Sequence, residues 1–295
     1  MRVFLTGPTG YLGSAVLDAL LRAGHSVTGL VREQGRARRL QARGADAVVG
    51  DMASPAWLDA AAGHDAFIHT ARQRGALRVE ADRVALETLM AAAAATGGRP
   101  RVLYTSSAWV LGATSKPADE SAEPRPPALV AWRPAHEAQL LGARDVTPIV
   151  IRPGTVYGGR RGLLGDLFRD GVNGLVRVIG DGRNRWATVY RRDLGELYAR
   201  LVSAPDASGI YHATDESGER VIDIVEALAR STVHKPDVRH VPIEEARAKL
   251  GQLADVLAMD QLVEARRARE AGWSPTLRSV ARSIPRLLEE WREDD

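Results

Sequence analysis

Three glycines near the N-terminus stand where phosphate-binding chemistry needs them. The stretch 6-TGPTGYLG-13 follows the short apolar run 2-RVFLT-6 and opens a helical pattern, which is the context that a dinucleotide-binding glycine loop requires. Glycines permit a tight turn, a close approach of the backbone to a diphosphate and close packing of helix on strand, and the helix N-terminus offers free N–H groups. An ordinary glycine turn is the alternative interpretation. We expect the loop to bind a dinucleotide through Gly7, Thr9, Gly10, Tyr11 and Leu12.

Residues that follow the next two predicted strands bear on which dinucleotide is bound. Arg32, with Arg36 close by, stands where an acidic residue would bind the ribose hydroxyls of NAD. A guanidinium can pair with a 2′-phosphate through two hydrogen bonds, so Arg32 favours NADPH. NADH is the alternative, because Glu33 could still reach a ribose. Asp51, beside Met52, is placed to accept a hydrogen bond from the adenine amino group, unless its carboxylate only caps a helix.

Strand and helix patterns alternate through the first 155 residues, and they must position these loops. Short apolar runs predict strands at 2–6, 26–31, 47–50, 65–71, 101–107 and 148–154, and helical spacing predicts helices at 12–24, 54–63 and 80–96 and around 132–136. Alternation with mostly apolar strands indicates a parallel sheet covered on both faces. We therefore expect an α/β fold: a Rossmann-type doubly wound parallel sheet over residues 1–158. The remainder, 159–295, is predicted to be mainly a smaller C-terminal substrate-binding lobe, interwoven with the core.

Composition excludes several classes of protein. The 295 residues include 45% apolar and 26% charged residues, which is an ordinary globular profile. The net charge is only +3 and no nucleic-acid-binding motif accompanies the arginines, so no nucleic-acid partner is expected. The absence of cysteine excludes disulfides and thiolate ligands, and we predict no metal site. No apolar run reaches the roughly 18 residues of a membrane span and no signal peptide is visible, so we expect a cytoplasmic protein without a membrane partner. Monomer and homodimer both remain open.

Further segments occur in a characteristic order: Asp51, 69-HTA-71, 105-TSS-107 and 152-RPGTVYG-158, then 186-WATVYRRDLGELYARLV-202, 209-GIYHATDE-216 and 271-AGWSP-275. With the glycine loop, this set resembles the extended short-chain dehydrogenase/reductases, which include sugar-nucleotide epimerases and dehydratases, over nearly the whole chain. The resemblance implies that Ser107 binds the substrate carbonyl, unless its hydroxyl only serves the local backbone. It implies a further set of cofactor contacts: Thr70, Ala71, Ser106, Pro153, Gly154 and Thr155.

The stretch 129-LVAWRPAHEAQLL-141 departs from that family's pattern. Trp132 stands at the place of the family's acid Tyr and His136 at that of its Lys, while Tyr190 replaces a downstream His. No Lys lies between positions 116 and 235, so the Tyr/Lys pair is absent rather than shifted. An indole N–H can donate a hydrogen bond but has no titratable proton. The remaining candidate catalytic residues are Ser107, His136 and Tyr190; a surface or supporting position is the alternative for His136.

Aromatic residues near these segments suggest the kind of substrate. Trp109, Trp132, Tyr157 and Trp186 are expected to line the pocket, and such walls suit a flat polycyclic molecule; core packing is the alternative. A ketone beside a phenolic hydroxyl could supply its own proton, so reduction would survive loss of the Tyr. The combination resembles the atypical ketoreductases of aromatic polyketide pathways, which implies an NADPH-dependent reduction of an angucyclinone-type ketone to a secondary alcohol.

Other functions stay open. Loss of the acid/base pair also fits a non-redox cyclase or isomerase that keeps the dinucleotide as a scaffold. A regulatory protein that senses the dinucleotide without turnover is a further alternative. A sugar-nucleotide epimerase is disfavoured, because that chemistry uses the Tyr as a reversible base.

Overall fold

A parallel sheet of seven strands forms the centre of the computed structural model, which describes residues 1–294. Its strand order is β10-β6-β5-β4-β1-β2-β3, and every pairing is parallel. The strands are β1 (Arg2–Thr6), β2 (Ser26–Val31), β3 (Asp46–Val49), β4 (Ala66–His69), β5 (Arg101–Thr105), β6 (Thr147–Pro153) and β10 (Gly209–Ala213). The first six confirm the predicted strands. Strand order reverses between β1 and β4, and ligands of such sheets bind beyond the carboxyl ends of the strands at that point.

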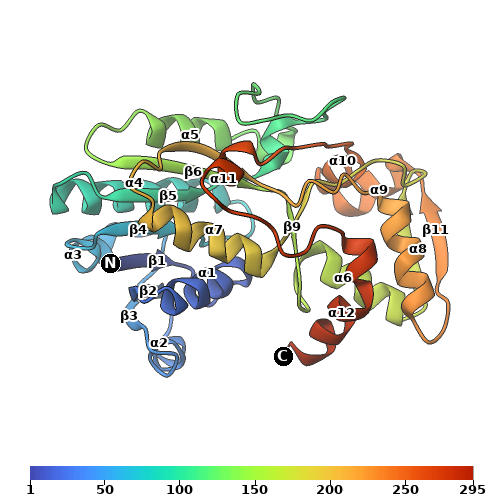
Figure 1. Cartoon of the computed structure of the whole chain (residues 1–295), viewed down its shortest axis with the longest axis horizontal. Helices are drawn as coiled ribbons and strands as arrows, with labels where there is room; N and C mark the ends of the chain where they lie inside the picture. The colour runs from blue at the N-terminus through green and yellow to red at the C-terminus, as the bar shows by residue number, and fades with distance from the viewer. Residues whose placement is uncertain (295) are drawn as a thin grey trace.

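Helices cover both faces of the sheet, as predicted (Figure 1). One face carries α1 (Tyr11–Arg22), α2 (Gln34–Gln41), α7 (Arg191–Ser203) and α11 (Arg266–Glu270), whose apolar side chains share a core with the sheet. The other face carries α3 (Leu58–Ala61), α4 (Arg78–Thr96) and α5 (Arg133–Leu141) over a second core. Apolar side chains at i, i+3 and i+4 spacing give each long helix one buried stripe, which explains why the periodicity located the helices.

Helix starts follow the local chemistry that the sequence shows. The Ser54 side chain accepts a hydrogen bond from the Ala56 N–H at 3.3 Å, and Pro55 occupies the first position of the turn that follows. That turn is the 3₁₀ segment η1 (Pro55–Trp57), which continues into α3. The predicted helix 54–63 is therefore shorter than expected and begins in 3₁₀ geometry.

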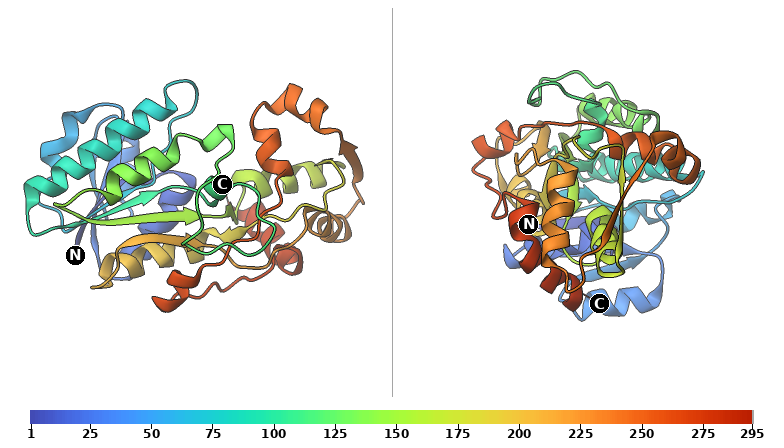
Figure 2. Two further views of the ribbon diagram at one scale, coloured as in Figure 1. Left: turned by 90° about the horizontal axis from the view of Figure 1, so that it is seen from above. Right: turned by 90° about the vertical axis from the view of Figure 1, so that its right-hand side faces the viewer.

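A smaller lobe packs at the carboxyl-end side of the sheet (Figure 2). It contains the strand pairs β7 (Thr155–Tyr157) with β9 (Thr188–Tyr190) and β8 (Leu175–Ile179) with β11 (Asp237–Val241). Its helices are α6 (Gly162–Val172), α8 (Val221–Ser231), α9 (Ile243–Leu250), α10 (Leu253–Ala258) and α12 (Val280–Glu293). The chain returns to the main sheet between these elements, since α7 packs on α1 and β10 pairs with β6. No described helix combines the length and apolar character that a membrane span requires.

Candidate active site

The glycine loop connects β1 to α1 with the close contacts that the spacing predicted. Gly7 has φ +73°, and a Cβ added there would lie 2.7 Å from the Ala71 Cα. A Cβ on Gly13 would lie 1.9 Å from the Gly7 carbonyl oxygen, so a side chain is excluded at both positions. Gly10 is the N-cap of α1. The first N–H groups of that helix have no intrahelical partner and are available to an anion.

The side chain of Tyr11 forms a hydrogen bond within the protein, while its backbone begins α1. Its phenol donates to the Gly158 carbonyl oxygen at 2.9 Å, so it ties the first turn of α1 to the segment after β7. Burial raises the pKa of this phenol, despite the opposing charge of Arg191. Leu12 packs partly against the core. The backbone N–H groups of both residues, in the first turn of α1, remain available to a dinucleotide.

At the ends of β2 and β3 the structure refines the predicted cofactor contacts. Arg32 is exposed, and its guanidinium contacts no acid within the described residues. Arg36 instead donates to the Thr9 hydroxyl at 3.3 Å, which places its guanidinium beside the glycine loop. Asp51 is exposed and accepts from the Ala53 N–H at 2.9 Å, while Met52 is buried in the core beneath α3 and α4. One Asp51 oxygen thus serves a local turn, but the cap of the following helical segment is Ser54 and not Asp51.

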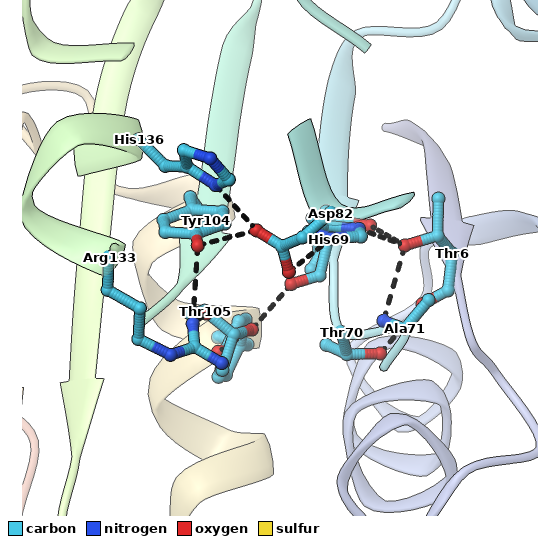
Figure 3. A network of polar contacts seen from close by, with 11 residues as sticks. Thr6, His69, Thr70, Ala71, Asp82, Tyr104, Thr105, Arg133 and His136 are labelled. Atoms are coloured by element: carbon cyan, nitrogen blue, oxygen red, sulfur yellow. Dashed lines mark hydrogen bonds and ion pairs between the residues drawn. The ribbon is translucent and has the colours of Figure 1, made fainter. Parts of the chain in front are cut away.

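The segment after β4 lies directly against the glycine loop (Figure 3). The Thr70 hydroxyl donates to the Thr6 carbonyl oxygen at 2.7 Å, and the Ala71 N–H donates to the Thr6 hydroxyl at 3.4 Å. These bonds hold 69-HTA-71, which includes the expected cofactor contacts Thr70 and Ala71, against the residue that precedes the glycine turn. Thr6 and Thr70 are more than 60 residues apart in the sequence. They meet because β1 and β4 are neighbouring strands of the sheet.

Ser106 and Ser107 follow β5 at the same edge. Ser107 is the N-cap of the 3₁₀ segment η2 (Ala108–Leu111), and its oxygen accepts from the Trp109 N–H at 3.2 Å. That bond uses a lone pair and leaves the hydroxyl proton free for another acceptor. The Ser106 hydroxyl is buried and has no hydrogen-bond partner within residues 1–294. Both hydroxyls therefore retain donor capacity at the carboxyl end of β5, next to the β4 segment.

Three of the expected cofactor contacts lie at the end of β6. The Gly154 N–H donates to the Ala213 carbonyl oxygen at 3.0 Å, and the Thr155 N–H donates to the Ala187 carbonyl oxygen at 2.7 Å. A Cβ on Gly154 would approach the Ala187 oxygen to 2.5 Å. Pro153, Gly154 and Thr155 are thus enclosed between β10 and the segment that leads to β9, at the same edge as Ser107.

A buried polar network that sequence reasoning missed supports this edge from below (Figure 3). Its centre is Asp82 on α4, which accepts from the Tyr104 hydroxyl at 2.7 Å, from His136 Nδ1 at 2.9 Å and from His69 Nε2 at 3.4 Å. His69 Nδ1 in turn pairs with the Thr6 hydroxyl at 2.7 Å. The network therefore links the ends of β1, β4 and β5 to α4 and α5. An acid on the buried face of an Ala-rich helix was its one visible signal.

Electrostatics keep that acid ionised. Burial alone would raise the pKa of Asp82, but the hydrogen bonds from His136 and His69 outweigh burial and lower it. A carboxylate that accepts several hydrogen bonds in a buried site is stabilised in its charged form. Asp82 therefore acts as a fixed anion that holds three donors, rather than as a proton source.

At the family's Tyr and Lys positions the two rings lie against each other. Trp132 and His136 make an edge contact with centroids 4.9 Å apart, and the Arg133 guanidinium stacks on the Trp132 ring at 4.5 Å. The His136 side chain is buried, which excludes the helix-surface interpretation, and its Nδ1 faces Asp82. Arg133 also donates to the Thr105 carbonyl oxygen at 2.7 Å. A guanidinium, not an ammonium, thus lies at the end of β5.

Tyr190 and Tyr157 are not brought to Ser107. Both are almost completely buried in the hydrophobic core of the C-terminal lobe. The Tyr190 hydroxyl donates to Glu290 on α12, and the Tyr157 hydroxyl donates to the Leu277 carbonyl oxygen at 3.3 Å. Burial and the Glu290 carboxylate raise the pKa of Tyr190 to about 12. Strand alternation explains the difference from the expected pocket wall, since β7 and β9 turn these positions toward the lobe.

The three tryptophans that were expected to line a pocket differ in their surroundings. Trp109 is partly exposed beside the small core of η2, and Trp186 donates its indole N–H to the Leu257 carbonyl oxygen at 3.0 Å. Trp132 is partly exposed, and its indole nitrogen is buried without a partner within the described chain. Of the four aromatic residues proposed to line a pocket, the three tryptophans keep exposed surface and Tyr157 does not.

Comparison with known proteins shows where this arrangement belongs. The sequence profile of the NAD dependent epimerase/dehydratase family matches residues 3–214. An uncharacterised protein of Schizosaccharomyces pombe is 31% identical over 286 residues, which cover 94% of this chain and 95% of that protein. The 4-hydroxy-2-methyl-3-oxo-4-farnesyl-3,4-dihydroquinoline-1-oxide ketoreductase of Stigmatella aurantiaca is 30% identical over 264 residues, covering 84% of this chain and 78% of that enzyme.

A solved structure agrees with the fold. The human epimerase family protein SDR39U1, crystallised with NADPH, has a TM-score of 0.78 at 18% identity, and the match covers 98% of this chain and 99% of that one. The glycine loop and the free N–H groups of α1 fit the nicotinamide dinucleotide from which the matched family takes its name. The chain therefore belongs to the NAD dependent epimerase/dehydratase family.

Proposed function

We propose that the chain is an NAD(P)H-dependent ketoreductase that reduces a ketone of an aromatic polyketide, of the angucyclinone type found in simocyclinone biosynthesis, to a secondary alcohol. One observation carries the proposal. Ser107 keeps a free hydroxyl proton beside the cofactor loops, while the place of the acid holds Trp132. Family membership and the likeness to a Stigmatella ketoreductase support a reductase. The reaction must therefore be one that does not need a protein phenol.

A dinucleotide bound on the glycine loop would supply a hydride to the carbonyl carbon. The Ser107 hydroxyl would donate to the carbonyl oxygen and hold the ketone in place. As the oxygen gains charge it needs a proton, and His136 Nδ1 is directed at Asp82 instead. We assign the proton to a phenolic hydroxyl next to the carbonyl on the substrate itself. That phenol protonates the alkoxide and regains its own proton from water, so the substrate gains one hydride and one proton overall.

NADPH is the proposed cofactor in preference to NADH. Arg36 is anchored at Thr9 and Arg32 is exposed after β2, so two guanidinium groups follow the strand whose end is expected to bind the adenosine ribose. Guanidinium groups bind phosphates through paired hydrogen bonds. This supports recognition of a 2′-phosphate by Arg36 together with Arg32.

The test uses purified protein, NADPH and two naphthyl ketones. One is 2-acetyl-1-naphthol, in which a phenolic hydroxyl adjoins the carbonyl; the other is 2-acetonaphthone, which lacks that hydroxyl. Absorbance at the nicotinamide band and product mass are followed together. We expect NADPH consumption with a two-hydrogen mass gain for the hydroxylated ketone, at least about tenfold faster than for its partner, because a positioned acid contributes roughly 10²–10⁴-fold.

Equal rates on the two ketones would refute proton supply by the substrate while leaving a reductase. Tight NADPH binding without oxidation of either ketone, or of an angucyclinone ketone, would refute the reductase. The non-redox and dinucleotide-sensing functions would then take precedence.

A further inference from the structure

Four arginines gather at the carboxyl ends of β4 and β5, and the reaction described above uses none of them. Arg72 and Arg74 lie in the loop after β4, Arg78 is the first residue of α4, and Arg133 is the first residue of α5. We call these four residues the arginine cluster. Thr105 links its two halves, since its hydroxyl donates to the His69 carbonyl oxygen at 2.5 Å.

Arg133 is held rigidly in this position. Its guanidinium stacks on the Trp132 ring at 4.5 Å, and its Nη1 donates to the Thr105 carbonyl oxygen at 2.7 Å and to the Tyr104 hydroxyl at 3.2 Å (Figure 3). These partners are neutral, so they fix the cation without neutralising it. Thr105 precedes Ser107 by two residues, so the cation is held at the same end of β5 that Ser107 follows.

The cluster has no direct ion-pair partner within the described residues. None of its four guanidinium groups forms an ion pair there, and the Arg78 Nε is buried without a hydrogen-bond partner. The nearby acids are already engaged: Asp82 holds Tyr104 and two histidines, and Glu80 pairs with Arg83. Arg78 also stands at the N-terminus of a 19-residue helix, where the helix dipole adds positive potential.

The other arginines of the cluster act on Arg72. Partial burial of its guanidinium and the neighbouring charges of Arg133, Arg74 and Arg78 lower its pKa, although the residue as a whole is exposed. Like charges gathered at one edge of the sheet cost free energy that a bound anion would offset. Arginine is also the side chain best suited to bind a carboxylate through two parallel hydrogen bonds.

We propose that the arginine cluster binds a carboxylate of the substrate, next to the carbonyl that Ser107 holds. The inference rests on the proposed function and narrows its substrate class to aromatic ketones that carry an acidic group. The same chemistry would suit a cofactor phosphate. However, Arg36, after β2, is proposed for the 2′-phosphate, and the free N–H groups of α1 are available to the diphosphate. These partners for the cofactor's phosphates favour the substrate as the source of the anion.

The test measures binding, so it does not depend on turnover. Protein saturated with NADP⁺ is titrated by calorimetry with 1-hydroxy-2-naphthoate, an aromatic carboxylate, and with the neutral 2-acetyl-1-naphthol. The double variant Arg72→Gln/Arg74→Gln removes two exposed members of the cluster without touching the buried network. We expect its Kd for the naphthoate to rise roughly tenfold to hundredfold, as for loss of charge-assisted hydrogen bonds. Its Kd for the neutral naphthol should stay unchanged.

Two further variants complete the design. Arg72→Lys/Arg74→Lys should recover part of the naphthoate affinity, because it keeps the charge but not the paired geometry. Arg144→Gln, at an exposed arginine outside the cluster, should bind both ligands like the parent protein. Equal naphthoate affinity in the parent and the Gln double variant would overturn the proposal. A matching loss of NADPH affinity would assign the cluster to the cofactor's phosphates instead.

Failure of the proposed function gives a different result. A protein that never oxidises NADPH yet binds the naphthoate through Arg72 and Arg74 keeps its anion site and loses only the reductase assignment. A protein that reduces 2-acetyl-1-naphthol but shows no effect of the Gln double variant keeps the reductase assignment and loses the anion site.

Discussion

Replacement of Asp82 by Ala should strongly destabilise the protein, because that carboxylate organises the edge of the sheet where the cofactor loops meet. Asp82 is 5% exposed and accepts hydrogen bonds from Tyr104, His136 and His69. In the Asp82→Ala variant all three donors lose their acceptor. His69 on β4 still pairs with Thr6, so the lost hydrogen bonds are concentrated between α4, α5 and β5.

The size of the effect follows from those three donors. Leaving a buried donor unsatisfied costs about 1–3 kcal/mol, and network effects are not additive. Removal of the buried charge also removes its desolvation cost, which offsets part of the loss. We therefore expect the free energy of unfolding to fall by about 3–5 kcal/mol. Asp82→Asn should recover part of it, since the amide oxygen still accepts.

Urea unfolding, followed by tryptophan fluorescence at neutral pH, measures this difference. Glu80→Ala is the matched control, because Glu80 lies on the same helix, is exposed and pairs only with Arg83; its free energy of unfolding should be nearly unchanged. The Asp82→Ala variant should also differ from the parent protein in how its stability depends on pH. The folded protein lowers the pKa of Asp82, so its stabilisation is present above the ordinary Asp pKa of about 3.9 and is lost as the pH falls through and below it.

The gap in stability between the parent protein and Asp82→Ala should accordingly narrow only below the ordinary Asp pKa, in curves measured at about pH 3 and about pH 2. A loss as small as that of Glu80→Ala would refute the view that this carboxylate holds the site together. A gap that stays constant or widens toward acid pH would refute the assignment of an ionised Asp82.

Three other predictions concern the cofactor and the proton. Gly13→Ala should weaken NADPH binding at least about tenfold as seen by fluorescence titration, because its Cβ would lie 1.9 Å from the Gly7 carbonyl oxygen; unchanged affinity would argue against the loop as the site. Arg36→Ala should raise the KM for NADPH roughly tenfold or more and leave that for NADH nearly constant, whereas equal effects would exclude a 2′-phosphate contact. His136→Ala and Tyr190→Phe should each keep kcat within about tenfold, since their polar groups face Asp82 and Glu290; a loss near 10³-fold would identify the missing acid.

Local signals in the sequence determined much of this protein. Apolar runs separated by helical spacing located six strands of the parallel sheet, because the strands in the middle of the sheet are buried on both faces. The glycine spacing located the dinucleotide loop, because Gly7 and Gly13 stand where no Cβ fits. The sequence also indicated the loss of the Tyr/Lys pair, since Trp132 and His136 stand at the two family positions in the stretch 129–141.

Only the tertiary structure decided how side chains distant in sequence meet. Strand β10 escaped prediction, and only the structure shows that it pairs with β6 at the edge of the sheet. His136 became a partner of Asp82 because α4 and α5 pack on the same face of the sheet. Tyr190 turned away from Ser107 because β9 belongs to the lobe and not to the main sheet. A sequence states which groups are present, but their hydrogen bonds and charges depend on distances that packing alone sets.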